Sequence, residues 1–343
     1  MIKRSAFTMR DIARLAGVSV STVSAVVNNK PVVSPALRTK VQQAIEAVGF
    51  RPHQGARGLR IRRTNLIGMV MTDATNPYFV EVMRGVEDKV IKNSYELMVC
   101  NSNDQTESEM RHLNALYAHR VDGILIAPCD SYAAREILVG SHAPLVFLDI
   151  VPIGAKVSSV VTDNLDATYE AIRYLVGLGH QKIAVISGRL VHSTSLDRLE
   201  GYHRAMREFN LPIREEYLAQ GDSHIESGYQ CGMRLLKSSD SPTAILALNN
   251  RMTLGVLRAL RELGVPCPGR VSLIGFDDSD WAIVFNPSLT TIAQPTYEIG
   301  QQAAELLLES IRAAEGGAVV EPRQIVLKSS LRIRESTGPA PNS

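Results

Sequence analysis

Residues 8–29, TMRDIARLAGVSVSTVSAVVNN, decide the fold of the first part of the chain. Thr8, followed three residues later by Asp11, is typical of a capped helix start, and Gly17 interrupts the helix that follows. Ser19 is placed to cap a second helix. Two helices joined by a short turn with a glycine are typical of a helix-turn-helix, although any small three-helix bundle shows the same pattern.

The apolar residues around this stretch predict one small core. At helical spacing, the two helices carry Ile12, Leu15, Ala16, Val23, Val26 and Val27. A third helix is expected from Ser34-Pro35 to the stop at Gly49. The second helix leaves Ser21, Thr22 and Ala25 outside this core, and such short side chains let a helix lie close to base edges in a DNA groove.

The charge of the chain is unevenly distributed. All 343 residues together carry a formal net charge of +2. Residues 1–63 carry 12 Lys and Arg against 2 acids, a net +10, and the remainder carries 25 against 33, a net −8. A basic head on an acidic body is typical of a module that binds a polyanion, although a basic disordered arm gives the same sum.

Residues 51–63, RPHQGARGLRIRR, are rich in arginine and poor in apolar side chains, so we expect a hinge without a core of its own. Gly55 and Gly58 each disfavour a helix by about 1 kcal/mol. Any helix in this segment therefore requires a stabilising partner, and a solvated basic linker is the alternative.

From residue 65 onward, short apolar runs alternate with amphipathic stretches. The runs predict strands at Leu66–Met71, Leu97–Cys100, Gly123–Ala127, Leu145–Leu148, Ser159–Val161, Ile183–Ile186, Ala244–Leu248 and Ser272–Phe276. The stretches predict helices at Val80–Lys92, Glu107–His119, Ala133–Val139, Ala167–Leu178, Leu199–Phe209, Ser227–Leu236, Leu254–Leu263 and Tyr297–Ile311. This alternation indicates parallel sheets covered on both faces, with more units than one ordinary sheet holds.

Polar residues follow several of these strands. They are Thr72-Asp73, Asn76, Asp149, Asp163-Asn164, Ser187-Gly188, Asn249-Asn250 and Asp277-Asp278. Ligands bind outside the carboxyl ends of parallel strands, so these residues predict a binding crevice. For any single one of them, capping the next helix is an equally good explanation.

Several classes of protein are disfavoured. The four cysteines are far apart, with no C-x-x-C pair, so we expect neither a metal site nor a disulfide framework. The start MIKRSAF lacks the apolar run of a signal peptide, and no stretch approaches the ~20 apolar residues of a membrane span, so we expect a cytoplasmic protein without a membrane segment. The motifs of nucleotide-binding loops, zinc proteases and serine hydrolases are missing, so we expect no cofactor and no enzyme activity.

The opening run, with VSPALRTKVQQAIEAVGFRP and GARGLR after it, resembles the N-terminal region of the lactose-repressor/galactose-repressor (LacI/GalR) family of transcription regulators. The resemblance continues through TNLIGMVMTDATNPYF, RVDGILIAP, DRLEGY, VSLIGFDD and PSLTTIAQP. It implies an α/β protein with a three-helix helix-turn-helix head and a periplasmic-binding-protein-like core of two doubly wound parallel-sheet lobes. It also implies a homodimer that binds a near-palindromic operator in double-stranded DNA under the control of a small-molecule effector.

The resemblance implies the following boundaries: head 1–50, hinge 51–63 and core 64–334. Within the core we expect lobe 1 at about 64–163 and 295–322, and lobe 2 at about 164–292 and 324–334. Residues 335–343 are expected to be a disordered tail. Tetrameric relatives add a C-terminal leucine-heptad helix, for which this tail is too short and too rich in proline, so we expect a dimer.

The family's base-reading positions fall on Val20, Ser21 and Ala25 in this sequence. Its phosphate-contacting positions fall on Thr8, Ser19, Thr22, Asn28 and Ser34. Its hinge helix falls on residues 53–60, where His53, Ala56 and Leu59 are the expected DNA contacts, Leu59 being the leucine that the family inserts into the minor groove. Relatives often carry Arg or His where this chain has Ala25, which offers only apolar contact to a base.

The family's effector-contacting positions fall on Tyr78, Phe79, Asp149, His192, Thr194, Arg198, Asn249 and Asp277, with Trp281 a further candidate. Arg198 and Asp277 suit hydroxyl or carboxylate groups, so a sugar or sugar-acid-like effector is expected. Relatives that bind purines stack the base on aromatic side chains where this sequence has Ile150 and Ser223, which disfavours a purine. His192, where relatives often have Arg, is either a group that changes charge near neutral pH or a plain hydrogen-bonding group.

Two other functions fit the core alone. A solute-binding protein of a transport system has the same kind of body, and parallel α/β sheets also host enzymes that act on small carbohydrates. The basic head and the missing export signal argue against the first alternative. The missing catalytic motifs argue against the second.

Overall fold

The computed structural model describes residues 7–27, 30–49, 63–141, 143–318 and 320–341. The chain forms two compact units, Met1–Thr64 and Asn65–Ser343. The boundary between them lies within one residue of the expected end of the hinge.

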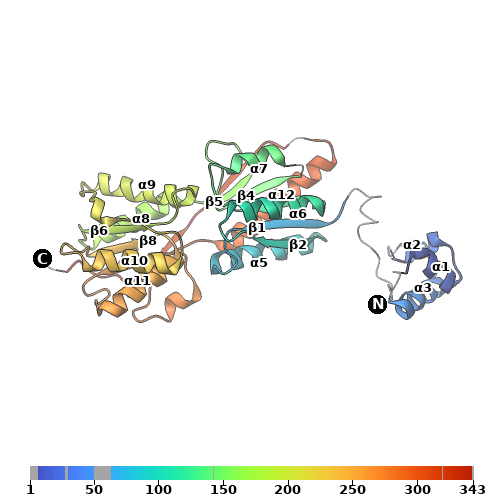
Figure 1. Ribbon diagram of the computed structural model, residues 1–343, viewed down its shortest axis with the longest axis horizontal. Helices are drawn as coiled ribbons and strands as arrows, with labels where there is room; N and C mark the ends of the chain where they lie inside the picture. Colours follow the sequence, from blue (N-terminus) through green and yellow to red (C-terminus); the bar gives the residue numbers. More distant parts are fainter. Residues whose placement is uncertain (1–6, 28–29, 50–62, 142, 319, 342–343) are drawn as a thin grey trace. The chain divides into compact units, whose positions relative to one another are not determined.

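The first unit contains three helices, α1 (Met9–Ala16), α2 (Val20–Val27) and α3 (Pro35–Val48) (Figure 1). They enclose a small core in which Ile12, Val23 and Val41 are fully buried. The predicted three-helix arrangement is confirmed. Leu15, expected in this core, is 57% exposed, and Ala13 is buried in its place, because the buried face of α1 includes Ile12 but is turned toward Ala13 and away from Leu15.

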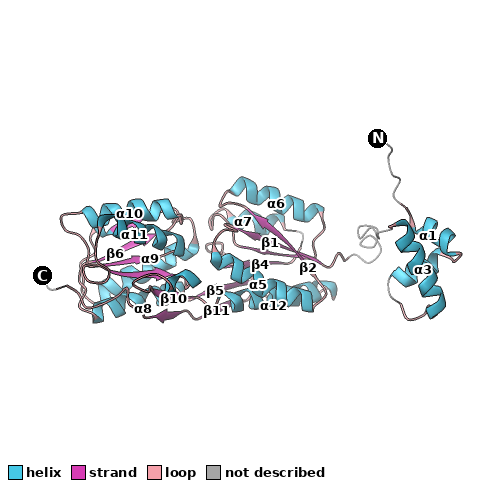
Figure 2. Ribbon diagram, turned by 90° about the horizontal axis from the view of Figure 1, so that it is seen from below, coloured by secondary structure: helices cyan, strands magenta, loops and turns pink. Residues whose placement is uncertain are grey.

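The second unit contains two lobes, each built on a six-stranded sheet with helices on both sides of the strands (Figure 2). The first sheet has the order β11-β5-β4-β3-β1-β2 and the second has β12-β10-β9-β8-β6-β7. All neighbouring strands are parallel except β10 and β12. The two predicted doubly wound parallel-sheet lobes are confirmed.

Lobe 1 has helices α5 and α12 on one face of its sheet and α6 and α7 on the other. Its elements are β1 (Leu66–Met71), α5 (Pro77–Lys92), β2 (Glu96–Asn101), α6 (Thr106–Ala118), β3 (Gly123–Ile126), α7 (Ala134–Gly140), β4 (Leu145–Leu148), β5 (Ser159–Thr162), α12 (Thr296–Glu315) and β11 (Gln324–Leu327).

Lobe 2 has α10 and α11 on one face and α8 and α9 on the other. Its elements are α8 (Asn164–Gly177), β6 (Ile183–Ser187), α9 (Ser193–Glu208), η1 (Glu215–Tyr217), β7 (Leu218–Gln220), α10 (Ile225–Lys237), β8 (Ala244–Ala247), α11 (Asn250–Leu263), β9 (Ser272–Phe276), η2 (Asp280–Ile283), β10 (Thr290–Ala293) and β12 (Ser330–Arg332).

Glycines allow two helix pairs to pack backbone against backbone. A Cβ at Gly300 of α12 would lie 2.0 Å from the Val82 carbonyl oxygen of α5. A Cβ at Gly255 of α11 would lie 2.2 Å from the Ile225 carbonyl oxygen of α10. No side chain fits at either position without moving a helix.

The expected lobe boundary near residue 324 is wrong. Strand β11 pairs in parallel with β5 of lobe 1, with Gln324 opposite Ser159, instead of belonging to lobe 2. Only β12 joins the second sheet. The chain crosses between the lobes after β5 and after β10, and its third crossing lies between Leu327 and Ser330.

The prediction of a disordered tail from Glu335 is wrong for the described part, up to Pro341. Ser336 is fully buried, and its carbonyl oxygen accepts a hydrogen bond of 2.8 Å from the Leu273 amide. The Gly338 carbonyl oxygen lies 3.0 Å from Nε2 of the buried His180. A short segment rich in Pro and Gly cannot form its own core, but its backbone can still satisfy polar groups of lobe 2.

Candidate DNA surface and effector cavity

Helix α2 presents the small side chains at its N-terminus to solvent. Ser19 caps the helix, because its Oγ accepts a hydrogen bond of 3.1 Å from the Thr22 amide. Ser19, Val20 and Ser21 are exposed, whereas Thr22 and Ala25 are half-buried. The face opposite the core is therefore open for contact with a macromolecule.

Two other predicted DNA contacts lie at helix starts. Thr8 and Asp11 form a reciprocal capping box at the start of α1, and the hydrogen bonds from Thr8 lower the pKa of Asp11. Ser34 is exposed at the start of α3. The predicted contacts Asn28, His53, Ala56 and Leu59 lie outside the described residues.

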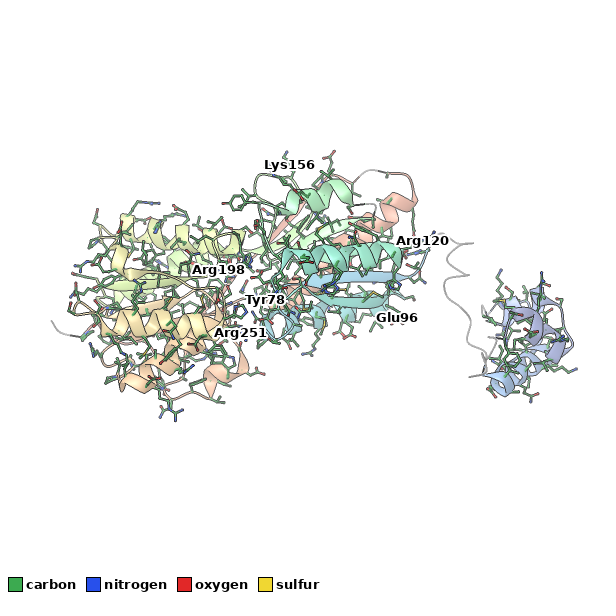
Figure 3. The ribbon with its side chains drawn as sticks, in the orientation of Figure 1. Tyr78, Glu96, Arg120, Lys156, Arg198 and Arg251 are labelled. Carbon is green, nitrogen blue, oxygen red and sulfur yellow. The ribbon has the colours of Figure 1, made fainter. Side chains whose placement is uncertain are left out.

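In the second unit, a cavity lies where the carboxyl ends of the two sheets meet. Its empty volume, including open solvent at the mouth, is about 790 Å³. Predicted residues that line it are Tyr78, Phe79, Asp149, His192, Thr194, Arg198, Asn249 and Asp277. Figure 3 shows Tyr78 and Arg198 where the two lobes meet.

Asp149 and Asp277 occupy corresponding places in the two lobes. Asp149 follows β4 with φ 60°, and its amide donates to Val160 of the next strand, β5. Asp277 follows β9 with φ 70°, and its amide donates to Ile292 of β10. Both carboxyls are buried, and this burial, which is the largest influence on their pKa, raises the pKa of each.

Arg198 is the buried cation of the cavity. Its Nε donates to Asn164 Oδ1 at 2.7 Å, its Nη1 donates to the Leu248 carbonyl oxygen at 2.8 Å, and its guanidinium lies 3.6 Å from the centre of the Phe276 ring. These contacts fix the orientation of the guanidinium. Its positive charge opposes the rise in the pKa of Asp149 and of Asp277.

Tyr78 and Phe79 form the aromatic wall from lobe 1, with ring centres 5.1 Å apart in an edge-to-face arrangement. Within the described part of the chain, Tyr78 Oη and Asp149 Oδ1 are buried atoms with no hydrogen-bonding partner other than the side chain of each other's residue. Burial and the nearby charges of Asp149 and Asp277 raise the pKa of Tyr78, so its hydroxyl stays protonated. Buried polar atoms with so few partners at a cavity wall are suited to a polar ligand.

His192 connects the cavity to an ion pair between the lobes. Its Nε2 lies 3.1 Å from Asp104 Oδ1 and 3.0 Å from the Cys129 carbonyl oxygen. Burial acts to raise the pKa of Asp104, but the hydrogen bonds and charges of His192 and Arg189 outweigh burial and lower it. His192 therefore contacts lobe 1 directly as well as lining the cavity.

Trp281 does not line the cavity. It lies in η2, where it packs against the core of lobe 2 and stands edge-on to Phe285 with ring centres 5.6 Å apart. Ile150 and Ser223, which fall where purine-binding relatives stack the base, line the cavity as well. Residues that the family positions did not indicate also line it: Thr72, Asp73, Asn76, Asn103, Asp104, Ser195, His224, Leu248 and Gln294. The places of Thr72, Asp73 and Asn76 after a strand were the signal that pointed to those three.

The described residues lack two features. In the ranges that the structure covers, no helix is both long and apolar enough to cross a membrane. Over the same ranges, no group of His, Cys, Asp and Glu side chains is arranged to hold a metal ion.

The chain is similar to known regulatory proteins over almost its whole length. A model of bacterial regulatory proteins of the lacI family matches residues 8–53, and a model of periplasmic binding proteins and the sugar binding domain of the LacI family matches residues 64–329. The HTH-type transcriptional repressor PurR of Vibrio vulnificus (strain CMCP6) is 35% identical over 310 residues, covering 90% of this chain and 93% of that protein.

Two solved structures show the same fold. The lac repressor dimer bound to operator and the anti-inducer ONPF has a TM-score of 0.85 and 29% identity, covering 97% of this chain and 100% of that one. The complex of the transcriptional regulator CelR with cellobiose has a TM-score of 0.74 and 29% identity, covering 96% and 99%. With its helix-turn-helix unit and its two-lobed cavity unit, the chain belongs to the LacI family of bacterial transcription regulators.

Proposed function

We propose that the protein represses transcription by binding a near-palindromic operator as a homodimer, with an affinity set by a small molecule in the interlobe cavity. The observation that carries this proposal is the combination, in one chain, of an exposed polar helix start on α2 and a cavity holding Arg198 between carboxyls from two lobes. The lac repressor dimer on its operator supports the dimeric mode of binding. In this function the protein performs no catalytic step and acts in the cytoplasm, where the operator DNA lies.

The effector we propose is a sugar-like molecule. Adjacent hydroxyls can each donate to a carboxylate, Asp149 or Asp277, and accept from the Arg198 guanidinium. The cavity holds two carboxyls, Asp149 and Asp277, and one guanidinium, Arg198, so it favours an uncharged sugar over a negatively charged sugar acid. Ile150 and Ser223 line the cavity where purine-binding relatives stack the base, and the CelR structure contains the sugar cellobiose.

Control of operator binding requires that the effector bind one arrangement of the lobes more tightly than another. A change in lobe closure would then alter the order of the hinge, residues 51–63, on DNA. A coupling of about 1–3 kcal/mol between the two sites would change the operator affinity by roughly 5–150-fold.

Operator binding is tested with the full-length protein against genomic fragments in excess random competitor. We expect salt-sensitive binding with preference for one palindromic sequence, and replacement of Ser21 or Ala25 should change the preferred half-site. Leu59→Ala should weaken specific binding and leave non-specific binding intact. If no fragment is preferred, the proposed function is wrong.

Effector binding is tested by a thermal-shift screen against sugars, sugar acids, polyols and nucleobases, followed by operator binding with each hit. We expect a neutral sugar to raise the melting temperature and to change the operator affinity. Asp277→Ala should abolish this response and leave operator binding unchanged. A normal response in that variant would exclude the cavity as the effector site.

A further inference from the structure

The two lobes touch directly at two places beside the effector cavity. At the first, Asp73, Thr75 and Asn76 of lobe 1 meet Asn250 and Arg251 of lobe 2, and we name this contact the Arg251 seam. At the second, Asp104, Cys129, Ser131 and Val151 of lobe 1 meet Arg189, Val191, His192 and Ser193 of lobe 2, and we name this contact the Arg189 seam.

The Arg251 seam contains one ion pair and one buried amide pair. Arg251 Nη1 lies 2.8 Å from Asp73 Oδ2 and also donates to Thr75 Oγ1. Asn250 Nδ2 donates to Asn76 Oδ1 at 2.8 Å, and both asparagines are at least 93% buried. Asp73 and Arg251 are mostly shielded from water, with side chains 25% and 22% exposed, so their attraction is stronger than that of a surface pair. Arg251 is labelled in Figure 3.

The Arg189 seam contains an ion pair and a row of hydrogen bonds at the start of α9. Arg189 Nη1 lies 2.5 Å from Asp104 Oδ2. The Ser193 amide donates to Ser131 Oγ at 2.9 Å, and Ser193 Oγ accepts from the Val151 amide at 3.0 Å. In both seams the acid belongs to lobe 1 and the arginine to lobe 2.

We propose that Arg251 and Arg189 are positioning residues that hold the lobes closed over the cavity, so that the two seams, together with the ligand, set the equilibrium between open and closed lobes. The inference rests on the proposed function only where it links closure to control of operator binding. Because both seams contain ion pairs, closure weakens as the salt concentration rises.

The test is amide hydrogen exchange of the full-length protein without DNA and without a small molecule. Arg251→Met should speed exchange about threefold to tenfold in residues 72–79 and 248–253, and Arg189→Met should do so in residues 129–131 and 189–195. The matched control is Arg258→Met, because Arg258 lies on the same helix as Arg251 and pairs with Glu226 of the same lobe. That variant should exchange like the wild type.

Pairwise substitutions separate closure from folding. Asp73→Asn with Arg251→Met should exchange no faster than either single variant, and Asp73→Arg with Arg251→Asp should regain part of the protection. Faster exchange throughout both lobe cores, or wild-type exchange in both arginine variants, would overturn the proposal. Since neither DNA nor effector is present, that result would leave the proposed repressor function intact, and loss of operator binding would leave the seams intact.

Discussion

The two lobes repeat one backbone plan but provide different side chains to the cavity between them. In both sheets an Asp with positive φ follows the fourth strand from the β2 or β7 edge. Lobe 1 adds the aromatic pair Tyr78 and Phe79, whereas lobe 2 adds the buried guanidinium of Arg198. The repeated fold therefore fixes where ligand-contacting groups lie, whereas single side chains divide the chemistry between the lobes.

The lobes also differ at their outer strands. Strand β11 lies parallel to β5, whereas β12 lies antiparallel to β10, because the chain runs on from the carboxyl edge of the first sheet and enters the second sheet at its carboxyl edge. Only lobe 2 is further covered by the segment around Ser336, which bonds to Leu273. Lobe 2 therefore depends on residues near the end of this sequence that lobe 1 does not use.

The largest expected effect tests the helix contact that the lobes share. Gly255→Val in lobe 2 or Gly300→Val in lobe 1 should each lower the free energy of unfolding of its own lobe by about 3 kcal/mol or more, since the new side chain would overlap a backbone oxygen. Urea unfolding followed by hydrogen exchange in each lobe measures this. Gly177→Ala is the control, because nothing lies within 4 Å of its Cβ position, and it should be neutral or slightly stabilising. Equal loss in both lobes from one variant would contradict their independence.

The second effect tests the cation that only lobe 2 supplies. Arg198→Met should weaken binding of a sugar hit from the screen by about 100-fold, because the carboxyls of the cavity lose their positive partner. Calorimetric titration gives the affinity. Arg204→Met serves as the control, since Arg204 lies on the same helix and its side chain is 51% exposed. An unchanged affinity in Arg198→Met would remove it from the site.

The third effect tests the segment that only lobe 2 uses. Truncation after Glu335 should lower the stability of lobe 2 by about 2 kcal/mol, because the buried amides of Leu273 and Thr290 lose their partners on Ser336. Lobe 1 should keep its exchange protection. A chain that ends at Pro341 is the control and should behave like the full sequence. Wild-type stability after the longer truncation would show that the segment contributes nothing.

The smallest effect compares the two corresponding carboxyls. Their pKa is raised in the folded state, so they stabilise the fold below the unfolded pKa of about 4, and this contribution is lost as the pH rises through the folded pKa. Asp149→Asn should therefore be more stable than the wild type by about 1 kcal/mol at pH 7 and show a flatter pH profile. The gain should be smaller for Asp277→Asn, since Gln294 donates to Asp277 at 2.6 Å.

Urea unfolding from pH 4 to pH 8 measures these profiles. Asp166→Asn is the control, because the Asp166 side chain is 70% exposed, and its profile should match the wild type. Profiles of Asp149→Asn and Asp277→Asn that coincide with the wild type would show that neither carboxyl is desolvated.

The apolar runs predicted the sheet cores well. Each of the eight predicted strands is present, with ends within one residue of the expected ones. Strands β7, β10, β11 and β12 were missed, because they have three or four residues and little of the continuous apolar character that marks a central strand. Because β11 was not recognised as a strand, its residues were assigned to the wrong lobe. Its parallel partner, β5, is separated from it by about half of the chain.

The site was predictable where it depended on strand ends. Asp149 and Asp277 follow strands that sequence alone identifies, and both line the cavity. The pairs of Asp104 with Arg189 and of Asp73 with Arg251 were not predictable, because each joins residues from different lobes whose approach no local pattern encodes. Trp281 was expected to contact the effector but packs against the core of lobe 2, because a large side chain near a ligand-binding loop can belong to the core.

The final strands of the two sheets, Gln324–Leu327 and Ser330–Arg332, follow each other within nine residues. During synthesis, neither sheet can be completed on the ribosome until this short stretch has left the exit tunnel, although most of lobe 1 is made some 160 residues earlier. Both lobes then gain their last strand almost together. Nascent chains stalled before residue 324 should consequently present β5 and β10 as unpaired edges to chaperones at the same time, and chains released after residue 332 should have both strands paired.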